Sequence, residues 1–294
     1  MKRAEVQRVR SFNRLVAERI GALGDEFLGR GRPMGESRTL WEIGPGGAEV
    51  RELRVRLGLD SGYASRVLRS LSRQGLIRIA ASASDRRVRW ARLTTAGRAE
   101  RADLDRRSDE VAWSCLEPLP PRLRVKLVAT MAEVERLLRA SLVRVAAEDP
   151  TSPAARWCIR QYFSELDARF RAGFDPARSI SADARELTAP TGALLVARLR
   201  QQPIGCGALK FHRGAPAELK RMWVAPEYRG LGLGRRLLLE LERHARRAGA
   251  RAVRLETNRA LKEAIQLYRR SGYREVTAFN DEPYAHHWFE KRLR

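Results

Sequence analysis

A short run of glycines is the segment whose residue types and spacing most clearly indicate chemistry. It reads Arg229-Gly230-Leu231-Gly232-Leu233-Gly234 and precedes an amphipathic helix predicted over residues 233–248. Glycines let backbone N–H groups converge on an anion, and the start of a helix adds partial positive charge. The segment therefore predicts a site for a pyrophosphate group. The dinucleotide-binding pattern G-x-G-x-x-G does not apply, because the glycines here are spaced differently.

The loop needs strands and helices to hold it, and the sequence predicts them on both sides. Strands are expected at residues 193–199, 206–211, 219–224, 253–256 and 287–289, and helices at 155–173, 233–248 and 259–271. Neighbouring strands followed by a strand–helix–strand pattern are typical of an α/β domain. The loop would then join the strand ending at Val224 to the helix that follows it.

Two ordered motifs give this region a more specific interpretation. Arg229, Gly232 and Gly234 fit the pattern Gln/Arg-x-x-Gly-x-Gly/Ala, and the second motif is Ala264-Ile265-Gln266-Leu267-Tyr268-Arg269-Arg270-Ser271-Gly272-Tyr273. Together they resemble the GNAT superfamily of acyl-CoA-dependent acetyltransferases, over about residues 155–294. The resemblance implies a fold with a mixed central sheet, acetyl-CoA as the acyl donor and a primary amine as the acceptor.

The resemblance also assigns residues to the acyl donor. The amides from Gly230 to Arg235, with the side chains of Arg229 and Arg235, would hold the pyrophosphate. The strand before the loop would pair its backbone with the acetyl carbonyl and the pantetheine arm. The implied donor-binding set is Met222, Trp223, Val224, Arg229, Gly230, Leu231, Gly232, Leu233, Gly234, Arg235 and Tyr268.

Two side chains are candidates for proton transfer. Tyr268 corresponds to the family tyrosine near the thioester sulfur, so it would protonate the leaving thiolate; the alternative is a buried aromatic of its helix. Glu218 lies eleven residues before Arg229 and would deprotonate the amine. Strand alternation puts it on the same side as Met222 and Val224. The alternative is a solvated strand end, in which Glu218 pairs with neighbouring basic residues.

The first half of the chain carries a concentrated positive charge. The formal net charge is +23, and residues 51–98 hold twelve arginines against three acidic residues. A field of this sign favours polyanions, nucleic acid above all, although a general bias toward arginine is an alternative. The clustering of arginines in residues 51–98 favours nucleic acid as the partner.

The elements predicted in this half form a helix-turn-helix followed by a hairpin. Helices are expected at residues 48–57 and 62–74, with Gly58 between them and Asp60 or Ser61 as the cap of the second. Strands 76–80 and 88–93 flank the polar turn 82–87 and form a basic wing. The remaining predicted helices are 4–22, 94–116 and 122–145.

Four segments of this half resemble the MarR family of winged-helix regulators in order and spacing, over nearly all of residues 1–145. They are Leu59–Leu68, Gly75–Ile77, Asp85–Arg87 and Leu93–Gly97. The resemblance implies a homodimer with interlocked first and last helices, a recognition helix in the major groove, a wing in the minor groove and a palindromic operator in double-stranded DNA. The candidate DNA-binding residues are Ser61, Tyr63, Ser65, Arg66, Arg69, Arg87 and Arg89.

These interpretations define a two-domain α+β protein. Pro150 and Pro153 interrupt the helical pattern, so we expect a mostly α winged helix-turn-helix domain at residues 1–147, a linker at 148–154 and an α/β GNAT domain at 155–294. Neither an apolar run long enough to span a membrane nor a secretory signal is expected, which predicts a cytoplasmic protein. The three cysteines and His286-His287 have no zinc-site spacing, so no metal is expected.

Three functions remain open at this point. The chain is either a bifunctional DNA-binding regulator and N-acetyltransferase, or a regulator whose GNAT domain only senses acyl-CoA or a small molecule, or an acetyltransferase whose winged helix serves only dimerisation. The retained loop glycines and Tyr268 favour an active enzyme, and the arginines at Arg66, Arg87 and Arg89 favour DNA binding.

Overall fold

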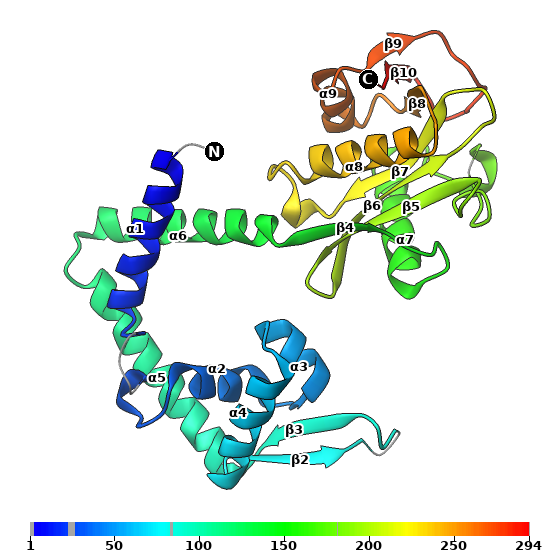
Figure 1. The fold of residues 1–294 in the computed structure, drawn as a ribbon. Helices are drawn as coiled ribbons and strands as arrows, with labels where there is room; N and C mark the ends of the chain where they lie inside the picture. Colours follow the sequence, from blue (N-terminus) through cyan, green and yellow to red (C-terminus); the bar gives the residue numbers. More distant parts are fainter. Residues whose placement is uncertain (1–2, 23–26, 83–84, 181, 294) are drawn as a thin grey trace. The chain divides into compact units, whose positions relative to one another are not determined.

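The computed structural model describes residues 3–22, 27–82, 85–180 and 182–293. The chain divides into two compact units, Met1–Ala129 and Thr130–Arg294. The division falls within a long helix, and each unit has its own hydrophobic core (Figure 1). We describe the two units one at a time.

The first unit is mostly helical and carries a small antiparallel sheet with the strand order β1-β3-β2. Its elements are α1 (Arg3–Arg19), a 3-10 turn (Phe27–Gly29), α2 (Met34–Ile43), β1 (Ala48–Glu49), α3 (Val50–Leu57), α4 (Ser61–Arg73), β2 (Ile77–Ala81), β3 (Arg89–Leu93), α5 (Thr95–Leu116) and the first half of α6 (Pro121–Ser141). Helix α2 was not predicted, and it contributes Leu40 and Ile43 to the core.

Local signals set the helix-turn-helix. Gly58 ends α3 in the left-handed region at φ 66°, which glycine adopts without steric cost. Asp60 then caps α4, because its side chain accepts a hydrogen bond from the backbone N–H of Tyr63 at 2.8 Å. On α4 the side chains of Val67 and Leu71 are buried, so the opposite face is left outward.

The second unit is a seven-stranded mixed sheet with helices on both faces. Its elements after α6 are β4 (Val143–Ala147), α7 (Pro153–Arg169), a 3-10 turn (Pro176–Arg178), β5 (Gly192–Leu199), β6 (Gln202–Lys210), β7 (Ala217–Val224), a 3-10 turn (Pro226–Tyr228), α8 (Leu233–Arg247), β8 (Ala252–Thr257), α9 (Lys262–Arg270), β9 (Arg274–Val276) and β10 (His287–Arg292). The strand order is β4-β5-β6-β7-β8-β10-β9, and only β7 and β8 are parallel.

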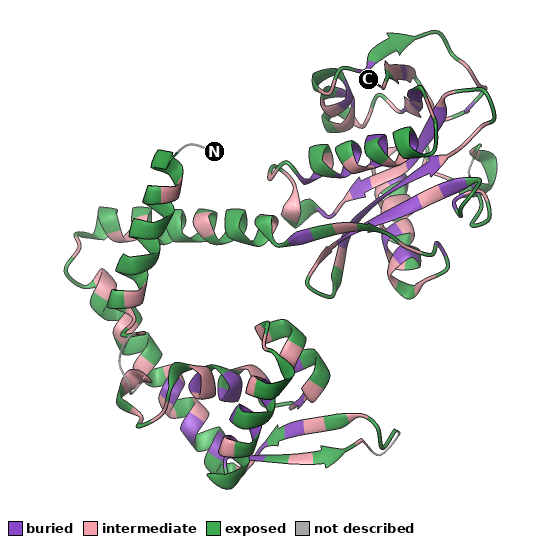
Figure 2. Ribbon diagram, in the orientation of Figure 1, coloured by how far each residue is buried: buried purple, intermediate pink, exposed green. Residues whose placement is uncertain are grey.

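Two separate buried clusters show which helices cover which face of this sheet. One cluster joins α8 and α9 to the sheet through residues such as Leu237, Leu241 and Tyr268. The other joins α7 to the opposite face through Ala155 and Cys158 (Figure 1). Buried residues follow the strands of this sheet (Figure 2). The sheet therefore lies between two helical layers.

The boundary region differs from the sequence-based prediction. The last helix of the first half was expected to reach residue 145, but α6 ends at Ser141 and β4 pairs antiparallel with β5 from Val143 to Ala147. The β-branched residues Val143 and Val145 favour a strand, and Val143 is buried there. Helix α7 begins at Pro153, inside the expected linker. Residues 143–147 therefore belong to the C-terminal sheet.

Candidate functional site

Strands β7 and β8 separate soon after they begin. They pair only at Ala217 with Val253 and at Glu218 with Arg254. Parallel strands that separate leave a crevice at their carboxyl ends, where α/β sheets commonly bind ligands. The segment Leu219–Val224 borders that crevice, and the glycine loop follows directly after it.

A β-bulge at Arg221 changes which side chains of β7 face the crevice. Cys206 pairs with Trp223 and Ala208 with Lys220, so one residue of β6 opposes two of β7, and Arg221 takes φ 53°. An extra residue reverses the alternation of side chains along a strand. As a result Leu219 and Met222 pack against the same cluster beneath α8 and α9.

Because of the bulge, the side chain of Glu218 does not lie on the face of the sheet that was predicted. Regular alternation was expected to put Glu218 on the side of Met222 and Val224, but that face carries Ala217 and Leu219 before the bulge. Glu218 therefore points to the other face of the sheet. The prediction was wrong because it assumed an unbroken strand.

The surroundings of Glu218 hold it as a charged partner. Its Oε1 accepts hydrogen bonds from Arg254 at 2.6 Å and lies 3.3 Å from His212 Nε2, and its Oε2 lies 3.5 Å from Lys220 Nζ. Burial alone would raise the pKa of Glu218, but the positive charges of Lys220 and Arg254 and the hydrogen bond from Arg254 outweigh it and hold this pKa below its usual value.

A pocket of about 100 Å³ lies where the strands separate. Its lining joins α7, the segment after it, β7, β8, α9 and the loop before β10. The lining residues used below are Tyr162, Phe163, Phe170, Phe174, Lys220, Arg221, Met222, Glu256, Tyr268, Glu282 and Tyr284. Glu218 does not line it.

Glu256 brings a carboxylate into this pocket. Its Oε1 accepts a hydrogen bond from Lys220 Nζ, and both side chains are buried. Its other oxygen, Oε2, is buried and has no hydrogen-bond partner in the described part of the chain. A buried carboxylate oxygen with spare acceptor capacity can take a proton or a hydrogen bond from a ligand.

Tyr268 lines the same pocket from α9. Its ring packs against Tyr273 and Phe289, with centroids 5.8 and 6.2 Å away. Burial, and then the negative charge of Glu256, raise the pKa of Tyr268 above its ordinary value. The hydroxyl therefore keeps its proton at neutral pH, as a proton donor must.

The glycine loop has the geometry of an anion cradle. Gly230 and Gly232 adopt φ 77° and 75°, a conformation that side chains rarely take, and α8 begins at Leu233. The first N–H groups of a helix have no acceptor within it, so those of Leu233, Gly234 and Arg235 are available to an anion. Arg235 is exposed beside them.

Arg229 and Trp223 both contact the carboxylate of Glu165. Arg229 Nε donates to the Val224 carbonyl at 2.8 Å, and its guanidinium pairs with Glu165 on α7. Trp223 Nε1 donates to the same carboxylate at 2.8 Å, and its ring is buried against α7. These side chains fix the loop and the end of β7 to α7. Glu165 was not predicted, because it lies far from the loop along the chain.

The predicted DNA-reading face of α4 is largely outward. Ser61, Ser65, Arg66 and Arg69 are exposed. Tyr63 is half-buried beneath the guanidinium of Arg66, which lies 5.8 Å from the ring centroid. The described part of the first unit thus keeps the polar and apolar faces of this helix separate, as expected.

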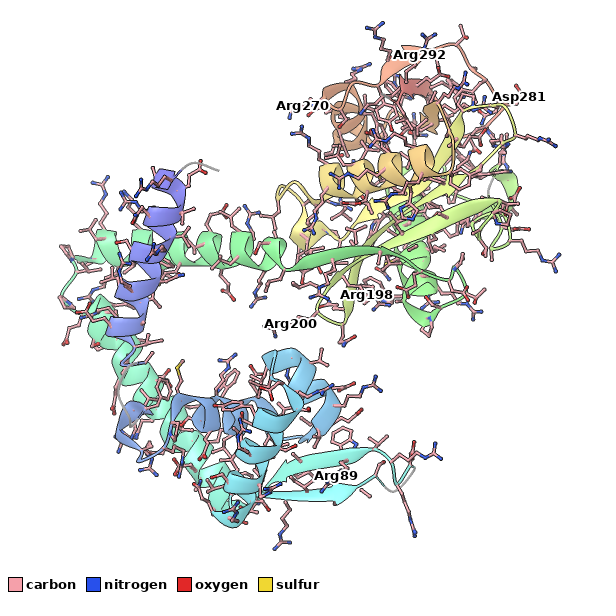
Figure 3. All side chains as sticks on the ribbon, in the orientation of Figure 1. Arg89, Arg198, Arg200, Arg270, Asp281 and Arg292 are labelled. Atoms are coloured by element: carbon pink, nitrogen blue, oxygen red, sulfur yellow. The ribbon has the colours of Figure 1, made fainter. Side chains whose placement is uncertain are left out.

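Two wing arginines are exposed. Arg89 extends from β3 (Figure 3). Arg87 lies in the turn before β3. Asp85 shapes this turn by accepting a hydrogen bond from the backbone N–H of Arg87 at 2.9 Å. Residues 83 and 84 of the predicted turn lie outside the described residues.

Comparison with known proteins agrees with these two units. A model of the acetyltransferase (GNAT) family matches residues 159–273, and a model of the MarR family matches residues 30–88. An IAA acetyltransferase of Azospirillum brasilense is 38% identical over 145 residues, which cover 49% of this chain and 90% of that protein. The chain belongs to the GNAT family and carries a MarR-family region before its GNAT domain.

Two further proteins each match about half of this chain. An uncharacterised N-acetyltransferase of Schizosaccharomyces pombe is 31% identical over 44% of this chain and 76% of its own length. A solved GNAT-family acetyltransferase from Staphylococcus aureus is 16% identical, covers 52% of this chain and 99% of its own, and has a TM-score of 0.45.

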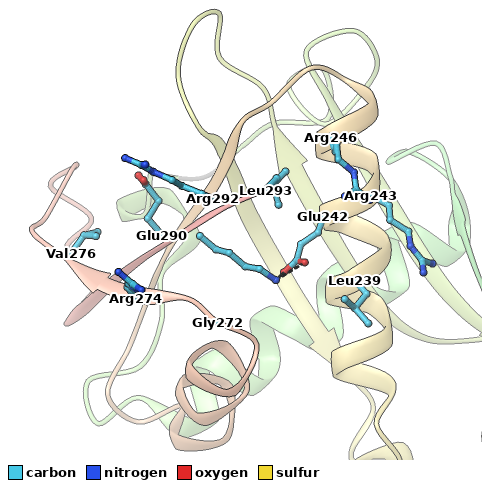
Figure 4. A pocket seen from close by; sticks show the side chains of 11 residues that line it. Leu239, Glu242, Arg243, Arg246, Gly272, Arg274, Val276, Glu290, Arg292 and Leu293 are labelled. Carbon is cyan, nitrogen blue, oxygen red and sulfur yellow. Dashed lines mark hydrogen bonds and ion pairs between the residues drawn. The ribbon is translucent and has the colours of Figure 1, made fainter.

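A larger hollow of about 1150 Å³ in the GNAT domain is separate from the pocket at Tyr268. It lies between α8 and the strands β9 and β10, and it shares no lining residue with that pocket. Lys291 donates to Glu242 there at 2.7 and 2.9 Å (Figure 4). Neither the glycine loop nor Tyr268 lines it, so we do not assign it to acyl transfer.

The described residues contain no group of histidine, cysteine and acidic side chains that could hold a metal ion. His287 instead contacts Glu275, with Nδ1 2.6 Å from Oε1. Within the same described ranges, every helix is too short or too polar to cross a membrane.

Proposed function

We propose that the GNAT domain transfers the acetyl group of acetyl-CoA to a primary amine. The observation that carries this proposal is the pocket shared by Tyr268 and Glu256, which pairs a proton donor with a proton acceptor at the end of β7. General acid–base catalysis of this kind contributes about 10²–10⁴-fold to a rate. The crevice, the pocket and the glycine loop follow one another along β7.

The loop supports the donor half of the reaction. The backbone N–H groups from Gly230 to Arg235 would hold the pyrophosphate of the donor, with the guanidinium of Arg235 beside it. One edge of β7 pairs with β6, and the pairing of its other edge with β8 ends at Glu218. Beyond that point, the edge at Met222 would receive the pantetheine arm as an added strand.

The residues of the pocket would then carry the protons. Glu256 Oε2 accepts a proton from the bound ammonium, and the nitrogen lone pair attacks the thioester carbonyl carbon. When the C–S bond breaks, the Tyr268 hydroxyl gives its proton to the thiolate. The former amine nitrogen then loses its second proton, which restores the Tyr268 hydroxyl, and Glu256 releases the first proton to solvent. We assign Glu218 to the support of Lys220 rather than to proton abstraction, because it is held in ion pairs outside the pocket.

We propose that the first unit binds double-stranded DNA as a homodimer. Exposed Arg66 and Arg69 on α4, with Arg87 and Arg89 in the wing, supply the charge and the reach for phosphate and base contacts. A two-fold dimer favours a palindromic operator.

Helices α1 and α6 support the dimer. Neither has a buried residue, and both are coloured as exposed along most of their length (Figure 2). Exposed apolar side chains in such numbers are typical of a surface that a partner covers. They include Val9, Phe12, Leu15, Val16, Leu123, Val125, Val128 and Met131.

An assay of CoA release with the full chain tests the enzyme proposal. The acceptor panel should contain amino acids, simple amines, lysine peptides, aminoglycosides and IAA, the last because the Azospirillum brasilense relative is named for it. Amine-dependent release that Tyr268→Phe abolishes supports the enzyme. Tight binding of acetyl-CoA without release for any acceptor would favour the sensor alternative.

A further inference from the structure

We propose that the acceptor of the GNAT domain is an arylalkylamine, a primary amine joined by a short carbon chain to an aromatic ring. The inference rests on the proposed acetyltransferase function and names the substrate class of the same pocket. It follows from an open carboxylate oxygen and an aromatic wall that line this pocket together.

Aromatic rings form one wall of the pocket. They come from α7, from the segment that follows it and from the loop before β10, and they are Tyr162, Phe163, Phe170, Phe174 and Tyr284. The ring centroid of Phe174 lies 5.6 Å from that of Phe163 and 5.8 Å from that of Phe170. It lies 4.8 Å from the ring centroid of Tyr284. Segments that are distant along the chain therefore join in one aromatic surface.

This aromatic wall is held in place and still has surface to offer. The Tyr284 hydroxyl accepts a hydrogen bond from the backbone N–H of Asp175 at 2.9 Å, which ties the loop before β10 to the segment after α7. The rings of Phe163, Phe170 and Phe174 are only half-buried. A ligand ring that covers them removes apolar surface from water and packs in the offset or edge-to-face geometry that aromatic rings prefer.

The open oxygen of Glu256 is the place for the amine. Glu256 Oε1 is engaged by Lys220, whereas Oε2 is buried without a hydrogen-bond partner among the described residues. An ammonium group brings the N–H donors that such an acceptor lacks. Glu282 also lines the pocket, but it already accepts from Ser179 Oγ at 3.0 Å and from the Ile180 N–H at 2.6 Å. The amine is therefore expected beside Glu256.

The two cations that line the pocket already interact with negative groups. Lys220 lies between two carboxylates, one on β7 and one on β8. The guanidinium of Arg221 lies 5.2 Å from the ring centroid of Phe163, and the negative charges of Asp183 and Glu186 act on it. The acceptor therefore needs no acidic group of its own.

The size of the pocket and the rest of its lining agree with a single ring. Leu166, Leu261 and Ala264 add apolar surface to it. Its volume is about 100 Å³, whereas pockets for drug-sized ligands hold about 300–1,000 Å³. A compact aromatic amine is therefore favoured over a peptide or an aminoglycoside.

Matched amines in the CoA-release assay test this inference. The panel compares 2-phenylethylamine with ethylamine, which lacks the ring, and with 2-cyclohexylethylamine, whose ring is not aromatic. We expect kcat/KM for 2-phenylethylamine to be at least about tenfold higher than for ethylamine, because the pocket buries the ring. It should be at least about twofold higher than for 2-cyclohexylethylamine, which has no aromatic faces.

Phe174→Ala removes the ring that contacts three others of the wall. The ratio of kcat/KM for 2-phenylethylamine to that for ethylamine should fall by at least about threefold in this variant. Phe279→Ala is the matched control and should keep the ratio, because Phe279 packs under Arg254 and does not line the pocket. Acetyl-CoA binding by calorimetry checks that each variant is folded. Phe174→Leu, which keeps an apolar side chain without a ring, replaces Phe174→Ala if that variant does not fold.

Three outcomes would overturn the inference and leave the enzyme proposal intact. The first is equal kcat/KM for 2-phenylethylamine and ethylamine in the unmodified chain, and the second is equal kcat/KM for the phenyl and cyclohexyl amines. The third is an equal loss for 2-phenylethylamine and ethylamine in Phe174→Ala, which would mean that the wall binds the ammonium instead of a ring. Absence of CoA release with every amine would overturn both proposals.

Discussion

Lys220 on β7 and Glu256 on β8 form an ion pair across the point where these two strands separate. Backbone pairing between the strands ends at Glu218 and Arg254, so this side-chain contact continues the connection where the ladder stops. The pair engages one oxygen of the Glu256 carboxylate and leaves the other without a hydrogen-bond partner among the described residues. This relationship makes Glu256 the preferred proton acceptor.

Replacement of Glu256 by glutamine should lower kcat by about 100-fold or more, because the amide cannot accept a proton from the ammonium. Steady-state CoA release measures it. The matched variant is Glu218→Gln, which removes a charge from the same cluster outside the pocket. It should reduce the unfolding midpoint while affecting kcat much less. If kcat falls more in Glu218→Gln than in Glu256→Gln, Glu218 is the base.

Tyr268→Phe should lower kcat by about 10²–10⁴-fold with little change in acetyl-CoA affinity, because only the proton donor is lost. Since burial raises the pKa of Tyr268, its protonated form persists above the ordinary tyrosine value of about 10. Activity that depends on this proton should therefore decline only above that pH. The measurement is the pH profile of kcat in the unmodified chain. A decline of kcat that is due to Tyr268 and lies below pH 10 would contradict the assignment.

Arg229→Gln and Arg235→Gln should differ in a way that separates anchoring from anion binding. Arg229 holds the Val224 carbonyl and Glu165, so its loss should raise KM for acetyl-CoA and also lower Tm, by about 2–4 °C for each kcal/mol lost. Arg235 is exposed, so Arg235→Gln should raise KM for acetyl-CoA without a change in Tm. Calorimetric melting with kinetics measures both. An unchanged Tm in Arg229→Gln would show that its contacts do not stabilise the loop.

Acid should destabilise the first unit through Glu100. This buried carboxylate pairs with Arg30 and Arg32, and the hydrogen bond from Arg30, above all, lowers its pKa. The folded pKa is below the unfolded value, so the stabilisation is present above the unfolded value of about 4.3 and is lost as pH falls through the folded pKa. Denaturant unfolding between pH 6 and pH 3 measures this. In Glu100→Gln the free energy of unfolding should decline less steeply as pH falls. A decline as steep as in the unmodified chain would exclude Glu100 as its cause.

Local signals explain how much of the molecule the sequence predicts. Helix α4 was predicted within a residue at each end, because its cap at Asp60 and its buried stripe are properties of neighbouring residues. Helix α2 was missed because Gly31, Pro33 and Gly35 at its start obscure a helical pattern. Strand β4 was missed because its partner is β5, some fifty residues away.

The site was predicted in part for the same reason. The loop and Tyr268 lie in contiguous motifs, so their positions could be inferred from sequence spacing. Glu256 and Arg221 depend on the bulge and on where β7 and β8 stop pairing. Both features arise from contacts between strands, which no spacing along a single strand encodes.

The arginines of α4 and the wing predict a particular salt dependence of DNA binding. Each phosphate contact releases counterions, so log K falls linearly with log salt concentration. Arg87→Ala and Arg66→Ala should each reduce that slope by about one where the arginine contacts phosphate. If Arg66 reads a base edge instead, its loss should relax sequence preference and leave the slope unchanged. Fluorescence anisotropy over a salt series measures these effects. Arg171→Ala, an exposed arginine of the GNAT domain, is the control. If both variants have the same salt dependence and the same sequence preference as this control, α4 and the wing do not contact DNA.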